Sequence, residues 1–318
     1  MTTNASHDRP RLYRVSRSAV ILLIVIVGLF AVSGWLQSRL ATTQPAATTP
    51  RHCHRIVSLA PSVTETLFAL GLHDRIVGVS RYCEFPPEAT HLPRVGGFFD
   101  PNIEAIIALD PDLVIFPTPG AAAQRSIEKL GLPTLVLDHR TPQGLFDSFT
   151  AIGQACDVQS EAAALAERLQ TRLRRVTKKT AGLPRRRVML VMDHSQTDGQ
   201  ITDAYVAGNS PSFNPFIRWA GGENVFADAI EASPVVSREA ILKANPEVIV
   251  DLASLANVQG QDGQAFIDQW KHLAQVDAVE HGQVYVITDN YARVPGPRFI
   301  LLVEQLARLF HPEADWKD

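Results

Sequence analysis

Short runs of β-branched and aliphatic residues alternate with amphipathic stretches along most of this chain. The runs expected to form buried strands are 55–60, 75–79, 112–116, 133–137, 187–192, 247–252 and 283–288. The stretches expected to form helices between the first four strands are 64–72, 103–109 and 121–131. Strand–helix–strand units of this spacing give parallel sheets covered by helices on both faces. The alternation therefore predicts an α/β fold.

An uninterrupted helical stretch separates the two series of strands. Residues 160–183, "SEAAALAERLQTRLRRVTKKTAGL", are rich in strong helix formers and contain no glycine or proline before Gly182. A helix of this length extends about 30 Å and has no flexible hinge. We therefore predict two α/β lobes with parallel sheets, at 54–157 and 184–318, joined by one long rigid helix at 158–183.

The N-terminal segment has the features of an export signal. Residues 1–18 are basic, residues 19–36 are apolar and uncharged, and residues 37–53 form a linker rich in Thr, Ala and Pro. The basic flank predicts that residues 1–18 stay in the cytoplasm and that the body is exported. The apolar run fits an uncleaved membrane anchor or a signal peptide cleaved after Ser33. Both interpretations place the body in the periplasm or on the extracytoplasmic face of the cytoplasmic membrane.

The body has neither the charge of a nucleic-acid-binding protein nor a common catalytic motif. Residues 51–318 hold 25 basic and 32 acidic residues, a net charge of −7 that disfavours nucleic acid. The chain lacks H-E-x-x-H, G-x-S-x-G, P-loop and G-x-G-x-x-G motifs, and "GNSPS" at 208–212 lacks the second glycine of a nucleophile turn. We therefore expect a monomeric binding protein, not an enzyme, with no resident cofactor or metal.

The chain has three cysteines, Cys53, Cys83 and Cys156. Export would permit a disulfide. Cys53 precedes the first predicted strand and Cys83 follows the second. Neighbouring strands of a βαβ unit are parallel, so these residues should be separated by roughly 16 Å, whereas a disulfide needs Cα atoms within about 7 Å. We therefore expect all three to be free or buried thiols.

One stretch of the sequence occurs twice in similar form. "EAIIALDPDLVI" returns 135 residues later as "EAILKANPEVIV". In each copy a preferred N-cap residue, Asn102 or Ser237, stands two positions before a glutamate, Glu104 or Glu239. Each glutamate should lie in the first turn of a short helix, where it complements the helix dipole. Its presence at matching places in both halves favours a docking role as well.

Several longer motifs accompany this repeat, namely "RIVSLAPSVTETLFALG", "VGVSRYCEFPPEA", "RVGGFFDPNIEAIIALDPDLVI", "AGGENVF", "VSREAILKANPEVIV" and "YARVPGPR". With them the chain resembles the periplasmic receptors for cobalamin and iron–siderophores that feed ATP-driven importers, over nearly all of 54–312. The resemblance implies a ligand cleft between two lobes. It also implies that the partner is a permease dimer with its ATPase subunits, and that Glu104 and Glu239 pair with arginines of the two permease subunits.

Aromatic and polar side chains follow several of the predicted strands. Ligands of open α/β sheets bind where the carboxyl ends of the strands lie. The candidate ligand-binding residues are Tyr82, Phe85, Phe98, Phe99, His194, Asp289, Tyr291 and Arg293. Aromatic rings with few charges suit a large, flat, largely apolar ligand. The resemblance implies cobalamin contacts for Tyr82, Phe98, Asp289 and Arg293, although Ser233 stands where some members have a tryptophan against the corrin.

The expected ligand is a corrinoid of the cobalamin type, and a ferric siderophore, haem or a bare metal ion are the alternatives. His194 and Tyr291 could be axial ligands of haem iron. His139, His194 and Asp289 could form a cage for a metal ion. A membrane-tethered interaction protein that has lost its ligand is a further possibility, and the mass of a co-purified ligand would distinguish these classes.

Overall fold

The computed structural model describes residues 53–118, 121–253 and 263–316. The predicted basic segment 1–18, the apolar run 19–36 and all of the linker 37–53 except Cys53 lie outside the described residues. Within the described ranges, no helix has the length and apolar character needed to cross a membrane. The described residues belong to one compact unit.

The N-terminal lobe is built around a four-stranded sheet, in the order β2-β1-β3-β4. All neighbouring strands are parallel, and Ile56 pairs with Ile76 on one side and Leu113 on the other. The strands are β1 (Ile56–Ser58), β2 (Ile76–Val79), β3 (Leu113–Pro117) and β4 (Thr134–Leu137). The helices are α2 (Pro61–Ala69), η1 (His73–Arg75), η2 (Pro87–His91), α3 (Ile103–Ala108), α4 (Ala121–Glu128) and α5 (Pro142–Cys156). Every strand and helix predicted in this half is present.

The C-terminal lobe contains a mixed sheet, in the order β10-β9-β5-β6-β8, with β7 pairing β5. The prediction of a parallel sheet is right for β10, β9, β5 and β7 and wrong for β6 and β8, which are antiparallel to their neighbours. β5 continues past its buried part into an exposed hairpin with β6, whose tight turn at Asp198 and Gly199 has positive φ at both residues. Two-residue turns of this kind join antiparallel strands.

The elements of this lobe follow the long helix in chain order. The strands are β5 (Arg186–Thr197), β6 (Gln200–Val206), β7 (Gly222–Asn224), β8 (Val235–Ser237), β9 (Val248–Asp251) and β10 (Val284–Val286). The helices are α7 (Phe213–Trp219), α8 (Arg238–Ala244), α10 (Gly263–Asp268), η3 (Gln269–Leu273), α11 (Asp277–Glu280), η4 (Asn290–Ala292) and α12 (Phe299–Phe310).

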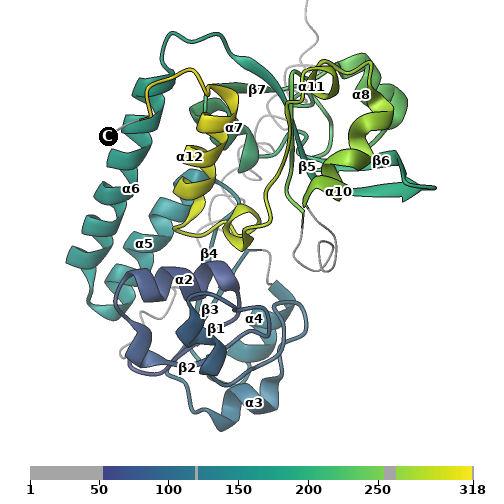
Figure 1. Ribbon diagram of the computed structural model, residues 1–318. Coiled ribbons are helices and arrows are strands. Elements are labelled where there is room, and N and C mark those ends of the chain that lie inside the picture. Colours follow the sequence, from purple (N-terminus) through teal and green to yellow (C-terminus); the bar gives the residue numbers. More distant parts are fainter. Residues whose placement is uncertain (1–52, 119–120, 254–262, 317–318) are drawn as a thin grey trace, which may run out of the picture. The chain divides into compact units, whose positions relative to one another are not determined.

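One long helix, α6 (Gln159–Thr180), connects the two lobes, as predicted (Figure 1). The apolar core is continuous along this connection, because a single cluster of buried residues includes both Leu113 of the first sheet and Val188 of the second. Aromatic rings carry the contact: the Phe299 centroid is 6.0 Å from that of Phe146 on α5 and 5.3 Å from that of Phe216 on α7. The two-lobe α/β architecture predicted from the sequence is therefore confirmed.

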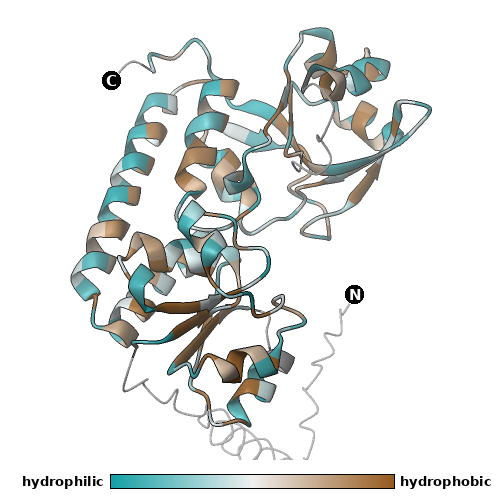
Figure 2. Cartoon of the chain, turned by 60° about the horizontal axis from the view of Figure 1, so that its bottom comes forward, coloured by the Kyte–Doolittle hydropathy of each residue, from teal (hydrophilic) through white to brown (hydrophobic). Residues whose placement is uncertain are grey.

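The central strands of the N-terminal sheet are apolar along their length (Figure 2). Ile56, Val57 and Leu113 to Phe116 are fully buried. Strands of this composition are expected in parallel sheets covered on both faces, because neither side of the strand meets water. The continuous apolar runs in the sequence correspond to these strands.

Cys53 and Cys156 form a disulfide, which corrects the prediction of three free thiols. Their Cα atoms are 4.9 Å apart. The prediction considered only the separation of Cys53 from Cys83, whereas α5 packs so that its last residue returns to the start of β1. Arg75 donates hydrogen bonds to the carbonyl oxygens of both Cys53 and Cys156. Cys83 is a free, buried thiol, within 3.1 Å of the Thr64 hydroxyl.

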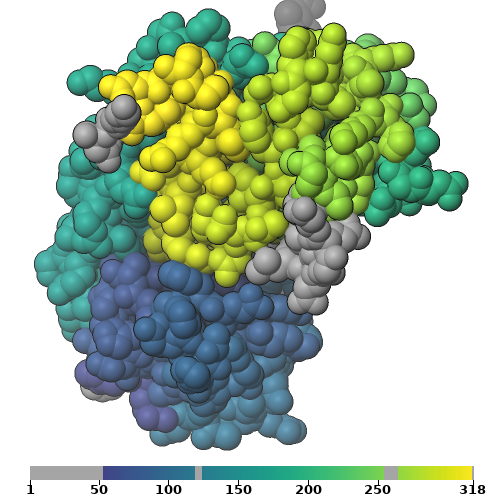
Figure 3. Space-filling view, in the orientation of Figure 1, coloured from purple at the N-terminus to yellow at the C-terminus, as the bar shows by residue number. Residues whose placement is uncertain are grey.

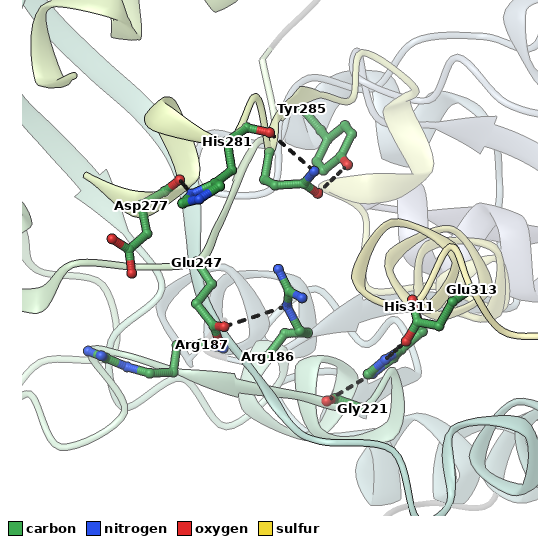
Figure 4. Close-up of polar contacts among 10 residues, drawn as sticks. Arg186, Arg187, Gly221, Glu247, Asp277, His281, Tyr285, His311 and Glu313 are labelled. Atoms are coloured by element: carbon green, nitrogen blue, oxygen red, sulfur yellow. Dashed lines mark hydrogen bonds and ion pairs between the residues drawn. The ribbon is translucent and has the colours of Figure 1, made fainter. Parts of the chain in front are cut away.

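Polar contacts close the amino ends of the parallel strands in the C-terminal lobe (Figure 4). Glu247 accepts a hydrogen bond from the Arg187 backbone N–H at 2.7 Å and lies 3.9 Å from Arg186 Nε. The His311 Nε2 atom lies 3.2 Å from the Gly221 carbonyl oxygen. These contacts tie the starts of β5 and β9 to each other, and the start of β7 to the end of α12.

Candidate functional site

A cavity of about 550 Å³ lies between the two lobes, beside the carboxyl ends of β1, β3 and β4. Its apolar wall comes largely from proline and aromatic side chains, and polar atoms make up only a small part of its surface. The residues that line it are Ala60, Pro61, Ser62, Phe98, Pro117, Thr118, His139, Arg140, Ser210, Pro211, Ser212, Phe213, Ala232, Ser233, Arg293, Val294 and Pro295. This size and composition are typical of a small-molecule site.

His139 lies in the floor of the cavity, directly after β4. Its ring is buried, and its Nδ1 atom is 2.9 Å from the Ser62 hydroxyl oxygen. Burial lowers the pKa of His139 to about 4, although the negative charge of Asp138 acts in the opposite direction. The imidazole is therefore neutral at physiological pH.

Two guanidinium groups border the cavity, one from each lobe. Arg140 donates to both carboxylate oxygens of Asp138, at 2.9 and 2.8 Å, and this pairing lowers the pKa of Asp138 to about 2. Arg293 donates to the Leu252 carbonyl oxygen at 3.1 Å. These contacts fix both side chains, and Asp138 compensates the charge of Arg140.

Aromatic rings of the N-terminal lobe extend from the cavity to its surroundings. Phe98 lines the cavity, and the Phe99 ring packs edge-on against it with centroids 4.7 Å apart. The Tyr82 ring lies over Gly97, because a Cβ added there would be 3.2 Å from Tyr82 Cε2. Phe99 and Tyr82 are 86% and 59% exposed. Large rings exposed beside an apolar cavity can cover a ligand that extends beyond it.

The structure does not bring all the predicted site residues together. Phe98 and Arg293 line the cleft cavity, and Tyr82 and Phe99 lie beside Phe98. Phe85 lines a different cavity, and Tyr291 lines a small cavity behind the Arg293 loop. The Tyr291 hydroxyl donates to Gln305 Oε1 at 2.7 Å, and the exposed Asp289 lies 3.4 Å from the same hydroxyl.

His194 is enclosed in the C-terminal lobe and does not line the cleft cavity. Its Nδ1 atom is 3.0 Å from an Asp251 carboxylate oxygen, and its Nε2 atom is 2.6 Å from Gln269 Oε1. Burial acts to lower the pKa of His194, but the adjacent Asp251 carboxylate outweighs it and raises the pKa. Both ring nitrogens are thus engaged within the protein, so the structure does not support His194 as an axial ligand of haem.

His139, His194 and Asp289, the candidates for a metal cage under the alternative of a bare-metal ligand, do not come together. Across residues 53–118, 121–253 and 263–316, no group of three His, Cys, Asp or Glu side chains has an arrangement that could hold a metal ion. His139 lies in the cleft, whereas His194 is paired with Asp251.

Several cavity residues were missed from the sequence. Thr118 and Arg140 follow β3 and β4, so the strand-end rule would have found them had it been applied to every predicted strand. His139 also follows β4, although the sequence indicated it only as a candidate metal ligand. The segment from Ser210 to Phe213 follows β6, an antiparallel strand that the sequence analysis did not predict.

The two repeated helices have the predicted caps. Asn102 Oδ1 accepts a hydrogen bond from the Ala105 N–H at 3.0 Å, and Ser237 Oγ accepts one from the Ala240 N–H at 3.4 Å. Glu104 on α3 and Glu239 on α8 are therefore the second helical residues, and both are exposed. Hydrogen bonds from its own backbone N–H and from Ser237 lower the pKa of Glu239.

Comparisons with known proteins agree with this architecture. A family model described as periplasmic binding protein matches residues 56–291. An uncharacterized ABC transporter substrate-binding lipoprotein of Bacillus subtilis (strain 168), YvrC, is 29% identical over 266 residues, which are 81% of this chain and 80% of that protein.

Solved structures give the same result. The periplasmic vitamin B12 binding protein BtuF of Vibrio cholerae matches with a TM-score of 0.66 and 28% identity, over 81% of this chain and 96% of that one. The periplasmic heme-binding protein BhuT, in complex with two hemes, matches with a TM-score of 0.70 and 25% identity, over 80% of this chain and 97% of that one. With the family match over residues 56–291, these likenesses establish that the chain belongs to the periplasmic binding protein family.

Proposed function

We propose that the chain is the substrate-binding component of an ABC importer, and that it captures a large metal chelate in the cleft between its lobes. The observation that carries this proposal is the cavity of about 550 Å³, whose surface is largely apolar. A site of this kind suits a flat ligand held by ring contacts and a few polar contacts. Among chelates, a corrinoid is the first candidate, since vitamin B12 is the ligand of one relative.

Haem is the second candidate, and the arginines of the cleft favour it. Arg140 and Arg293 place two guanidinium groups at the cavity, one from each lobe, and Arg140 would have to exchange Asp138 for a ligand carboxylate. Guanidinium groups pair well with carboxylates, and haem carries two. A heme-binding protein is also among the relatives. A carboxylate-bearing ferric siderophore would use the same two groups.

Docking to the importer is assigned to Glu104 and Glu239. Both glutamates are exposed at the first turns of equivalent short helices, one in each lobe. A permease with two-fold symmetry presents the same surface twice, so a carrier with one carboxylate on each lobe is complementary to it. The disulfide agrees with an exported body, since such bonds persist in oxidising compartments. Residues 19–36 would then anchor it to the membrane or be removed.

Isothermal titration calorimetry tests the ligand class. The purified body is titrated with cyanocobalamin, dicyanocobinamide, hemin, a ferric hydroxamate and Fe³⁺. We expect one chelate to bind, and Fe³⁺ alone not to. Phe98→Ala should weaken binding of that chelate by about 1–3 kcal/mol, because the ring would lose its contact with the ligand face. The control is Tyr205→Ala, which removes an exposed ring on β6 outside the cavity. Failure of every chelate to bind, or equal effects of the two variants, would contradict the proposal.

A further inference from the structure

Glu65 and Arg298 form a buried ion pair where the two lobes meet. Arg298 donates from Nε to Oε2 at 2.9 Å and from Nη2 to Oε1 at 2.5 Å. The Glu65 side chain is 3% exposed and the Arg298 side chain is 15% exposed. Glu65 belongs to α2 of the N-terminal lobe, and Arg298 is the N-cap residue of α12 in the C-terminal lobe. In the space-filling view, the yellow C-terminal part of the chain lies directly against the blue N-terminal lobe (Figure 3).

The pair lines a second cavity, and neighbouring residues of the same two chain segments line the cleft cavity. Pro61 and Ser62, at the start of α2, line the cleft cavity, whereas Glu65 lines a second cavity of about 610 Å³ together with Phe85. The loop before α12 is divided in the same way: residues 293–295 line the cleft, and Pro297 and Arg298 line the second cavity. A displacement at the ion pair would therefore occur only a few residues along the chain from a wall of the cleft cavity.

Close packing leaves the loop little freedom at this point. A Cβ added at Gly296 would lie 3.0 Å from Glu65 Oε2 and 3.4 Å from Ser62 Cα. The Phe85 ring covers the guanidinium, with its centroid 3.7 Å from Arg298 Cζ. The bidentate geometry and the ring hold Arg298 in one orientation.

The charges at this contact are removed from water. Burial raises the pKa of Glu65, while the hydrogen bonds and charge of Arg298 act to lower it. An intact pair compensates each charge with the other. When one partner is removed, the remaining charge is buried without compensation, and such a loss is strongly destabilising. Separation of the lobes is then the route by which that charge regains water.

We propose that Glu65 and Arg298 are positioning residues, forming an interlobe latch that holds the lobes together before ligand arrives and fixes the wall at residues 293–295. Phe85, expected from the sequence to touch the ligand, instead supports the latch. The effect of the latch on ligand affinity rests on the proposed function. Its effect on lobe separation does not.

Double electron–electron resonance tests the latch in the ligand-free protein, because it measures the distribution of distances between two spin labels. Spin labels are placed at Ile107→Cys in the N-terminal lobe and Ile230→Cys in the C-terminal lobe, both exposed, while Cys83 is buried and the other cysteines are bonded. Glu65→Gln should lengthen and broaden the distance distribution. The matched control is Glu304→Gln, because Arg172 and Glu304 form the same bidentate pair, at 2.8 and 2.6 Å, between α6 and α12. It should leave the distribution unchanged.

Two further variants keep the test decisive if Glu65→Gln does not fold. Arg298→Lys retains the charge but not the bidentate contact, so a smaller broadening is expected. Glu65→Leu with Arg298→Met removes both charges and should restore much of the wild-type distribution. Wild-type distributions in both Glu65→Gln and Arg298→Lys, or equal broadening in the Glu304→Gln control, would overturn the proposal.

The same variants report on the ligand site. If cyanocobalamin or hemin binds the wild type, that ligand should dissociate from Glu65→Gln at least about tenfold faster, equivalent to roughly 1.4 kcal/mol. Its dissociation rate from Glu304→Gln should equal that from the wild type. If neither ligand binds the wild type, the ligand assignment fails, while the distance measurements still decide the latch. Broadened distributions with unchanged dissociation of a bound ligand would remove the positioning role.

Discussion

His139 is the cleft residue whose protonation is most altered by folding. Its ring is buried beside Ser62, and within the described part of the chain its Nε2 atom has no hydrogen-bond partner. Burial lowers its pKa from 6.5 to about 4. A neutral imidazole in the floor of the cleft keeps the ligand site from gaining charge in a mildly acidic medium.

This pKa predicts how stability depends on pH. The unfolded chain binds the His139 proton near pH 6.5 and the folded chain only near pH 4. The folded state therefore loses up to about 3 kcal/mol as the pH falls through that window, and is unaffected by this group above it. His139→Gln should reduce the slope of the unfolding free energy against pH by the equivalent of up to one proton. Urea unfolding from pH 4 to 7 measures this slope. An unaltered slope in the variant would show that other groups carry the decline.

Residue roles were the least predictable part of the molecule from sequence. Phe98 and Arg293 reach the cleft because they follow strands and lie at the ends where ligands bind. Phe85 and His194 satisfy the same rule, yet Arg298 engages the first and Asp251 the second. Those partners are 213 and 57 positions away in the chain, so local sequence could not reveal them.

The strands of the N-terminal sheet, the long helix and the two repeated helices were predicted well, because their signals are local. The short β-branched and aliphatic runs predicted the strands of the N-terminal sheet, and the N-cap residues Asn102 and Ser237 predicted the starts of α3 and α8. The antiparallel strands β6 and β8 were missed because the repeated strand–helix pattern was extended to the C-terminal lobe. The Cys53–Cys156 bond was missed because it depends on how α5 packs, which periodicity does not report.

The disulfide joins the first and last residues of the N-terminal lobe, so it closes nearly the whole lobe into one covalent loop. The sequence separation is 103 residues. Loss of a native disulfide typically costs about 2–5 kcal/mol of the free energy of unfolding, and a loop of this length places the expected value near the upper end of that range. Cys53→Ser with Cys156→Ser should lose that amount in denaturant titrations, and reduction of the wild type should match it. As a control, reductant should not change the stability of the double variant. Equal stability of the oxidised and reduced wild type would contradict this account.

The whole molecule combines two lobes with a connection that resists bending. α6 has no internal glycine or proline, and the Phe146, Phe299 and Phe216 rings form an apolar bridge between the lobes beside it. The sequence predicted the helix but not the aromatic bridge or the Glu65–Arg298 contact. A preformed cleft of this kind would bind ligand with little change in lobe separation, and would keep Glu104 and Glu239 at a constant spacing.

Uptake by cells tests most directly whether the protein delivers its ligand to an importer. The chromosomal copy is deleted and replaced by wild type, Glu104→Arg, Glu239→Arg or both, and uptake of the labelled chelate that binds the purified protein is measured. Ligand affinity should be unchanged in all variants, because both glutamates are exposed and neither lines the cavity. Each single variant should reduce uptake and the double variant should abolish it, since like charges would meet at both permease subunits. Wild-type uptake by the double variant would contradict the docking role and with it the proposed delivery to an importer.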